Sequence, residues 1–513
     1  MNDLRARSGR LRAGRFDRGA AAQQWIEVPR REAEVGPALG HGPRPRAPRL
    51  DWQLLAQIAL CVIPAFTLVG LGRLSLGGQC FFLCLLALLA GLALRGQSLG
   101  FLCLIVGTLP AMMLLRNEFY YSGVQIILGA GAFLRFYLCR QELPRVWSNR
   151  PLRYLLISAG AYWLLSYFLT GVYHSNLRAL ELAFTVLCIY LLASHPQRLK
   201  TALAGLGISS FAIAFAFLQY GYRPGIEGSE FSLANPISFG IPIAVILLLS
   251  LAGNGRWLLL EKRPLWRWMI GLAAGFFLVL STSRGSWLTA LVGLALIFVL
   301  ESRRRKALLI SFVSLALVVT VLLQTERGEI VIGSLDLTFS SEKTLAQSTS
   351  GRSDQWLVFA RAFPDSPVWG FGPGSGGSIY ARYSLEESRE RDDVFLAGVA
   401  LIWHSLFLHV GAETGLIGLA CLLLLIGVLF RRGLTHWRMF GDSVPLIGLL
   451  GFLVIGLTIA GLDAASGIFL GLGFLAGKVL HQPLFAVAKG GEVIPRAPGG
   501  GERAPRPWSR QTT

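Results

Sequence analysis

Charged residues are scarce in this chain, and acidic residues are the scarcest. Only 15% of the 513 residues are charged, with 29 acidic against 48 basic side chains, while 53% are hydrophobic. The mean hydropathy is +0.55. A soluble domain carries about 25% charged residues, so the composition excludes an ordinary soluble fold. It predicts an all-α, polytopic membrane protein.

Metal-binding and disulfide patterns are missing as well. All seven cysteines lie inside apolar runs, where cysteine packs as a small hydrophobic side chain. Cys80 and Cys84 share one helix face, but nothing nearby completes a metal site, and no zinc or disulfide spacing is present. The sequence predicts no metal and no cofactor.

The net charge of +19 would suit nucleic acid only if the cations were grouped. Eleven of the 48 lie in residues 1–50, and most others lie in short connections between apolar runs. We therefore expect no nucleic-acid partner. Residues 1–50 are rich in Arg, Ala, Gly and Pro without periodicity, which predicts a disordered basic tail that touches anionic lipid. We expect no signal peptide in this region, because the first apolar run starts only at Asp51.

Fourteen apolar runs follow, each near the ~20 residues that a bilayer core requires. They lie at 51–72, 78–95, 99–115, 120–139, 153–171, 177–193, 201–219, 236–252, 265–281, 285–300, 306–323, 401–430, 444–462 and 464–480. Two tight hairpins among them leave re-entry open as an alternative to spanning. We predict 12–14 transmembrane helices: eleven over 51–323 and three over 401–480, followed by a disordered cytoplasmic tail at 481–513.

The cations alternate between successive connections, as the positive-inside rule requires. Connections on the side of the N-terminal tail hold basic clusters, whereas short connections on the other side hold at most one cation each. The clusters comprise Arg140, Arg145, Arg150 and Arg153; Arg198 and Lys200; Arg256, Lys262, Arg263 and Arg267; residues 303–306; and Arg431, Arg432 and Arg438. The single cations are Arg73, Arg116, Arg178, Arg223 and Arg284. Both termini are therefore expected in the cytoplasm, and residues 324–400 form one large outer loop, periplasmic in a Gram-negative bacterium.

Two segments of this loop have recognisable patterns. "RSDQWLVFARAF" places Trp356, Phe359, Ala360 and Phe363 at helical spacing, which predicts an amphipathic helix at the membrane surface. "PDSPVWGFGPGSGG" must then turn sharply. Its glycines do not form a nucleotide-binding loop, because neither a strand before them nor a helix after them is predicted.

Arg284 stands alone between two apolar runs, at the outward end of a span. It could be an interfacial arginine that extends its head group to water. A lone guanidinium also suits an anionic ligand, because it pairs bidentately with phosphate oxygens. Arg178, Arg223, Arg352 and Arg361 are further cations on the same side.

Three ionisable residues open the span after the loop: His404, His409 and Glu413. His409 and Glu413 share a helix face, whereas His404 and Glu413 are nine residues apart and fall on nearly opposite faces of an unbroken helix. Either His404 precedes the helix, or the two residues have different roles. Buried Glu413 needs a partner, and its pairing with His409 could be wholly structural.

Together these motifs resemble a known family. "STSRG" (281–285), a long outer loop with "GRSDQW" and "FPDSPVWGFGPGSG", and "HSLFLHVGAETGLIG" (404–418) look like the O-antigen ligase and Wzy-type polysaccharide polymerase superfamily. The resemblance covers about 265–430. One departure is Ser405, where the family most often has Asn.

The resemblance implies a GT-C-like glycosyltransferase of the bacterial inner membrane. It would use an undecaprenyl-diphosphate-linked glycan on the periplasmic side, without a metal. By position, Arg284 and Arg352 match the arginines that hold the donor diphosphate, and His404 matches the essential histidine. Arg361 and Arg223 are additional candidates for the diphosphate, and Glu413 is a second catalytic candidate.

Three functions fit this resemblance. We favour polymerisation of O-antigen or exopolysaccharide repeat units, because fourteen spans and a basic tail exceed the compact build of ligases. The alternatives are O-antigen ligation to lipid A core and, from a different class, transport of a lipid-linked glycan by a flippase. The expected partners are the lipid-linked oligosaccharide, membrane lipid, a chain-length regulator and a flippase.

Overall fold

The computed structural model describes most of the chain from residue 143 onward. The described residues are 106, 143–170, 174–220, 236–252, 257–259, 263–281, 283–325, 328–329, 332, 352–384, 403–458, 464–476, 485–487 and 493–495. Residues 51–513 form one unit, separate from residues 1–50, and every element below belongs to it. The four spans predicted before residue 140 and the tail at 1–50 lie outside the described residues.

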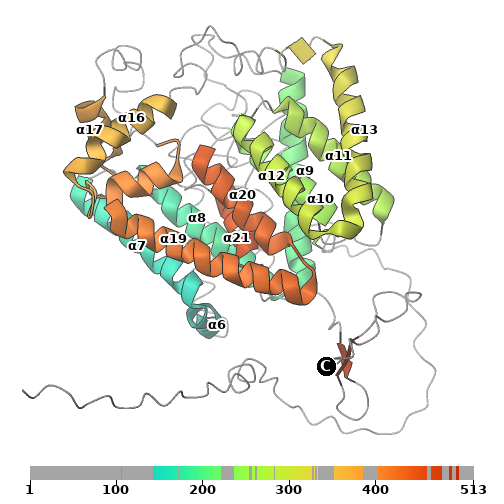
Figure 1. The fold of residues 1–513 in the computed structure, drawn as a ribbon, viewed down its shortest axis with the longest axis horizontal. Coiled ribbons are helices and arrows are strands. Elements are labelled where there is room, and N and C mark those ends of the chain that lie inside the picture. Colours follow the sequence, from blue (N-terminus) through green and yellow to red (C-terminus); the bar gives the residue numbers. More distant parts are fainter. Residues whose placement is uncertain are drawn as a thin grey trace, which may run out of the picture. The chain divides into compact units, whose positions relative to one another are not determined.

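Ten apolar helices lie where the remaining spans were predicted (Figure 1). They are α7 (Arg150–Thr170), α8 (His174–Leu192), α9 (Pro196–Tyr220), α10 (Pro236–Leu251), α11 (Pro264–Leu280), α12 (Arg284–Leu300), α13 (Arg305–Leu323), α19 (Leu406–Phe440), α20 (Val444–Thr458) and α21 (Ala464–Gly473). The shorter elements are α6 (Leu143–Ser148), η2 (Ser302–Arg304), α16 (Arg352–Ala362), η3 (Phe363–Asp365), α17 (Gly376–Tyr383), and an antiparallel pair of three-residue strands, β1 (Phe485–Val487) and β2 (Val493–Pro495).

Several of these helices have the length and composition of membrane spans. Among the described residues, three qualify singly, at Arg150–Leu169, Pro196–Phe215 and Leu406–Phe440. Arg284–Leu300 and Ser302–Val321 would together give a fourth, bent by 110°. The prediction of an all-α, polytopic membrane protein is confirmed; the count of 12–14 spans stays a prediction.

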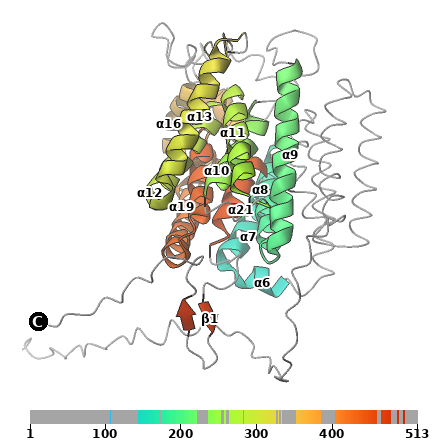
Figure 2. The ribbon, with the colours of Figure 1, turned by 90° about the vertical axis from the view of Figure 1, so that its right-hand side faces the viewer.

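The core of the bundle is built on α20 and α21, which pack against each other and against α8, α12 and α19 (Figures 1 and 2). Glycine permits the closest of these contacts. A Cβ on Gly467 would lie 2.9 Å from Thr185, and one on Gly471 would lie 2.7 Å from Ile189, so α21 approaches α8 through two small residues four apart. Their spacing predicts close helix packing of this kind.

A second, smaller core joins α16 and α17 to the start of α19. Val358 and Ala362 of α16, and Ile379 and Tyr380 of α17, pack with three residues around the start of α19: Trp403, Leu408 and Ala412. The helix predicted from this segment is present as α16, and its position at the membrane surface stays a prediction. Trp356 is half exposed and Ala360 is exposed, because α16 turns Val358 and Ala362 toward the protein.

Candidate active site

The first basic residue of the site, Arg284, begins α12. A serine turn sets its position: Ser281 Oγ donates to the Leu278 carbonyl (2.7 Å) and accepts from the Ser283 amide (3.3 Å). The Ser283 and Ser286 hydroxyls are 2.9 Å apart. These local bonds fix the turn between α11 and α12, which places Arg284 at the first position of α12.

Arg352 begins α16 and lies beside Arg284. Burial lowers the pKa of Arg352, and the positive charge of Arg284 lowers it further. Two guanidinium groups brought this close repel each other unless an anion lies between them. Arginine also matches the planar, bidentate geometry of phosphate. The pair is therefore a candidate site for an anion, as predicted from the sequence.

His404 lies just before α19 begins at Leu406, where the positive charges of Arg352 and Arg178 act on it. Its backbone N–H donates to Oε1 of the buried Gln355 (2.7 Å), one turn along α16 from Arg352. One short helix thus carries both an arginine of the site and the group that holds His404. Sequence reasoning missed Gln355; the signal for it was a polar side chain on the same helix face as Arg352.

Partial burial lowers the pKa of the His404 imidazole, and the positive charges of Arg352 and Arg178 add to the effect. The side chain nevertheless keeps an exposed face. Because an ordinary histidine has a pKa near 6.5, a lowered value leaves His404 neutral at physiological pH. A neutral, accessible imidazole beside cations can accept a proton.

Glu413 occupies a different place. α19 is broken at Gly415, where φ is +64°, and the outer loop docks on the break. The amides of Phe371 and Gly372 donate to the carbonyls of Ala412 (2.9 Å) and Glu413 (3.0 Å). In return, the Leu416 amide donates to the Pro367 carbonyl (2.8 Å). The loop therefore satisfies the backbone groups that the break leaves open.

The Glu413 carboxylate completes this docking. It accepts from the amides of Gly374 (2.6 Å) and Gly376 (3.2 Å), and Gly376 is the first residue of α17. The Tyr162 hydroxyl of α7 donates to the same carboxylate. His409 Nε2 lies 2.7 Å from the Tyr162 oxygen and 3.7 Å from Glu413. Every contact described for Glu413 holds the loop, α7 and α19 together.

The structure thus resolves the mismatch between His404 and Glu413. His404 precedes the helix and lies in the positive field of Arg352 and Arg178, whereas Glu413 anchors the glycine-rich loop. Of the other candidates, Arg178 of α8 contributes positive charge at His404, and Arg361 is exposed in the last turn of α16. Arg361 follows Arg352 by nine residues and lies on the opposite side of that helix. Arg223 lies outside the described residues.

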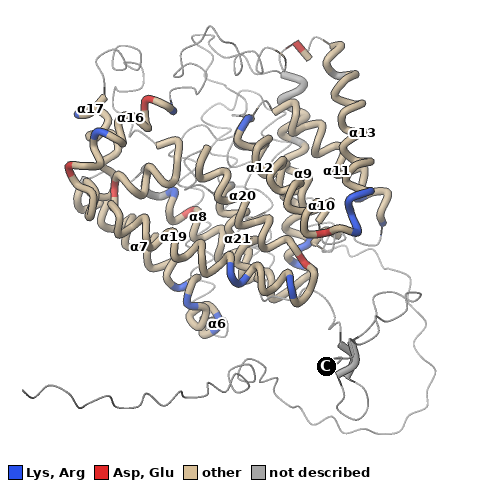
Figure 3. The backbone as a smooth tube through the Cα atoms, viewed as in Figure 1, with Lys and Arg blue, Asp and Glu red and all other residues tan. Residues whose placement is uncertain are grey.

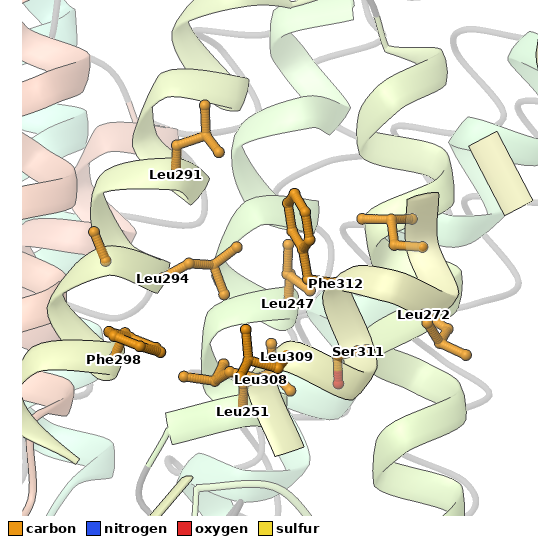
Figure 4. A pocket seen from close by; sticks show the side chains of 13 residues that line it. Leu247, Leu251, Leu272, Leu291, Leu294, Phe298, Leu308, Leu309, Ser311 and Phe312 are labelled. Carbon is orange, nitrogen blue, oxygen red and sulfur yellow. The ribbon is translucent and has the colours of Figure 1, made fainter. Parts of the chain in front are cut away.

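The bundle also contains an apolar pocket of about 270 Å³ between α10, α11, α12 and α13 (Figure 4). Leucine and phenylalanine side chains, among them Leu247, Leu294 and Phe298, line it, and Ser311 adds one hydroxyl. It has no cation for a phosphate and no base for proton transfer. In the part of the chain that the structure describes, no group of three or more His, Cys, Asp or Glu could hold a metal ion.

Fold and site together define a helical membrane protein in which Arg352 and Arg178 lower the pKa of a histidine that lies just before α19. Residues 269–423 match the family model described as O-antigen ligase, a segment that runs from α11 into α19 and includes Arg284, Arg352, His404 and Glu413. This match confirms the predicted resemblance to the O-antigen ligase and Wzy-type superfamily over that segment, which is less than half of the chain. No curated protein matches the chain.

Proposed function

We propose that this protein is a metal-independent glycosyltransferase that polymerises undecaprenyl-diphosphate-linked repeat units of a surface polysaccharide. The reaction would take place on the periplasmic side of the bacterial inner membrane. The observation that carries the proposal is the position of His404 in the positive field of Arg352 and Arg178, with Arg284 acting in turn on Arg352, which supplies cations for an anionic group beside a proton acceptor.

The transfer joins the acceptor hydroxyl oxygen to the anomeric carbon of the donor glycan. The bond from that carbon to the diphosphate oxygen breaks, and its electron pair leaves with undecaprenyl diphosphate. Negative charge therefore grows on the leaving group, and preorganised cations such as Arg284 and Arg352 stabilise it. The diphosphate leaves without a general acid.

His404 is the proposed general base. It takes the proton of the acceptor hydroxyl, and the neutral state favoured by its surroundings is the one that this role requires. Glu413 is assigned a positioning role, because its carboxylate is engaged by Tyr162 and two loop amides. The apolar pocket along α12 suits the hydrocarbon part of a lipid-linked donor better than its sugar.

O-antigen ligation is the second candidate, because the matched family model is described as O-antigen ligase. The same site would then transfer the glycan to lipid A core instead of to another lipid-linked unit. A flippase is a candidate from a different class, but transport alone does not require a neutral histidine beside bound diphosphate.

The proposal is tested in cells by glycan length. His404→Ala and Arg284→Ala, at normal abundance, are expected to abolish long-chain glycan. The matched controls, His195→Ala and Arg431→Ala, change exposed residues outside the site and should leave it intact. Wild-type chain lengths in the site variants would remove the proposed site.

A deletion separates the three functions. Loss of an O-antigen polymerase leaves single repeat units on the acceptor, and loss of an exopolysaccharide polymerase leaves lipopolysaccharide unchanged. Loss of a ligase leaves bare core with retained lipid-linked polymer. Loss of a flippase traps the lipid-linked unit on the cytoplasmic side, which would refute both transferase assignments.

A further inference from the structure

A second pocket, with a polar lining, lies at the C-terminal ends of α12 and α19, the two helices that begin at the candidate active site. α12 starts at Arg284 and ends at Leu300, about 25 Å away at 1.5 Å per residue. α19 starts just after His404 and ends at Phe440. The pocket between their ends has a volume of about 560 Å³, within the ~300–1,000 Å³ range of small-molecule sites. Its lining includes Glu301, Arg303, Arg304, Trp437, Arg438 and Asp442.

The two acidic residues of this pocket are engaged by other groups. Asp442 accepts from Trp257 Nε1 (3.2 Å) and from the Val444 amide (3.1 Å), and it lies 3.5 Å from His436 Nε2. Glu301 accepts from the Ser443 hydroxyl and pairs with Arg304 at 3.3 Å. These contacts tie the end of α12 to the start of α20.

Arg303 and Arg438 are the excess cations. Both are exposed, and among the described residues neither pairs with an acidic side chain. Arg303 also lies just before the N-terminus of α13, where the helix dipole disfavours a cation and favours an anion. Figure 3 shows basic residues grouped between the end of α12 and the start of α13, and along the last turns of α19. The pocket therefore presents unneutralised positive charge.

The surroundings place this charge at the edge of an apolar surface. On α12 and α13, Val299, Leu309 and Ile310 are more than half exposed, and on α19 Met439 is 59% exposed. Trp437, which lines the pocket, is of the type enriched at membrane–water interfaces. Basic pockets between membrane helices on the cytoplasmic side bind anionic lipid head groups.

We propose that this pocket binds the phosphate head group of an anionic phospholipid, with Arg303 and Arg438 as its charged ligands. The site lies at the opposite ends of α12 and α19 from Arg284 and His404, and the proposal does not depend on the transferase reaction. A free phosphate would meet the same arginines, but it would make no use of the apolar surface that borders them.

The experiment measures lipid binding by purified protein in nanodiscs. Discs of phosphatidylcholine with a minor fraction of phosphatidylglycerol are compared for wild type, R303Q/R438Q and the control R150Q/R431Q. The control removes two exposed cations from the same predicted side, outside the pocket. Phosphatidylglycerol retained after mild extraction is counted by native mass spectrometry.

Wild type and control are expected to retain phosphatidylglycerol, and R303Q/R438Q to lose at least ten-fold in apparent affinity. Equal retention by all three proteins, or equal loss in R303Q/R438Q and the control, would overturn the proposal.

Competition with inorganic phosphate is the second part of the experiment. If millimolar phosphate displaces the lipid completely from wild type, the pocket recognises a free anion and the lipid assignment is wrong. A thermal-unfolding midpoint unchanged in R303Q/R438Q shows that the variant is folded, and R303K/R438K, which keeps both charges, should retain the lipid.

Discussion

Docking of the glycine-rich loop on the break in α19 can be tested by comparing two glycines of that loop. Gly370 and Gly372 both have positive φ, +69° and +95°. A Cβ on Gly370 would lie 2.5 Å from the backbone carbon of Glu413 and 2.6 Å from the Gly415 nitrogen. A Cβ on Gly372 would meet nothing closer than a Leu169 methyl group at 3.7 Å. Gly370→Ala therefore pushes the loop off α19, and Gly372→Ala does not.

The two substitutions share the backbone penalty and differ in the hydrogen bonds that they break. An L-residue with positive φ costs about 1–2 kcal/mol in either position. Gly370→Ala additionally breaks the loop's hydrogen bonds to α19, of which three join the backbones of 367–372 and 412–416 at 2.8–3.0 Å. At about 0.5–1.5 kcal/mol each, the extra cost is roughly 1.5–4.5 kcal/mol. This corresponds to a tenfold to thousandfold difference in the opening equilibrium.

Hydrogen exchange measured by mass spectrometry reports this opening directly. The amides of Phe371 and Leu416 should exchange at least tenfold faster in Gly370→Ala than in Gly372→Ala. Glycan synthesis should fall with them, because the loop connects α16, which carries Arg352, to α19. Equal exchange rates in the two variants would show that the loop does not dock as described.

Three further predictions concern the active site. Transfer activity should fall at low pH, where His404 gains a proton and can no longer act as the base. Arg352→Gln removes a positive charge that lowers the His404 pKa, so the midpoint of this fall should move to higher pH. An unchanged midpoint would contradict His404 as the titrating base. Glu413→Gln weakens charge-assisted bonds of about 1.5–3 kcal/mol, so the rate should fall about ten- to hundredfold with the acidic limb unmoved, whereas loss of that limb would make Glu413 the base. Gln355→Ala frees the His404 backbone and should reduce kcat about threefold to tenfold with KM little changed; a full rate would exclude a positioning role for Gln355.

The helices could largely be predicted from the sequence. Apolar runs of near-bilayer length place α7 to α13 and α20 within a few residues of their observed bounds, whereas α19 ends ten residues later than predicted and α21 ends seven residues earlier. This works because membrane spans must satisfy their backbone internally, so length and hydropathy determine them. The alternation of cations predicts an outer position for Arg284 and His404, and that orientation stays a prediction.

The details of the site could not be predicted in this way. The break at Gly415 does not change the hydropathy of the apolar run. It depends on a loop more than forty residues earlier, which supplies the missing backbone hydrogen-bond partners. Which face of α16 packs against the protein depends on the second core formed with Trp403 and α17. That core buries Val358 and leaves Trp356 half exposed. Both features are tertiary contacts between distant segments, so local periodicity does not specify them.

Transfer by purified protein in proteoliposomes tests the central claim most directly. The substrate is an undecaprenyl-diphosphate-linked oligosaccharide, and the measured products are lengthened glycan and released undecaprenyl diphosphate. We expect wild type to form both in equal amounts. His404→Ala should form neither, while still binding the donor through Arg284 and Arg352. Release and elongation at the wild-type rate by His404→Ala would contradict the assignment of His404 as the base.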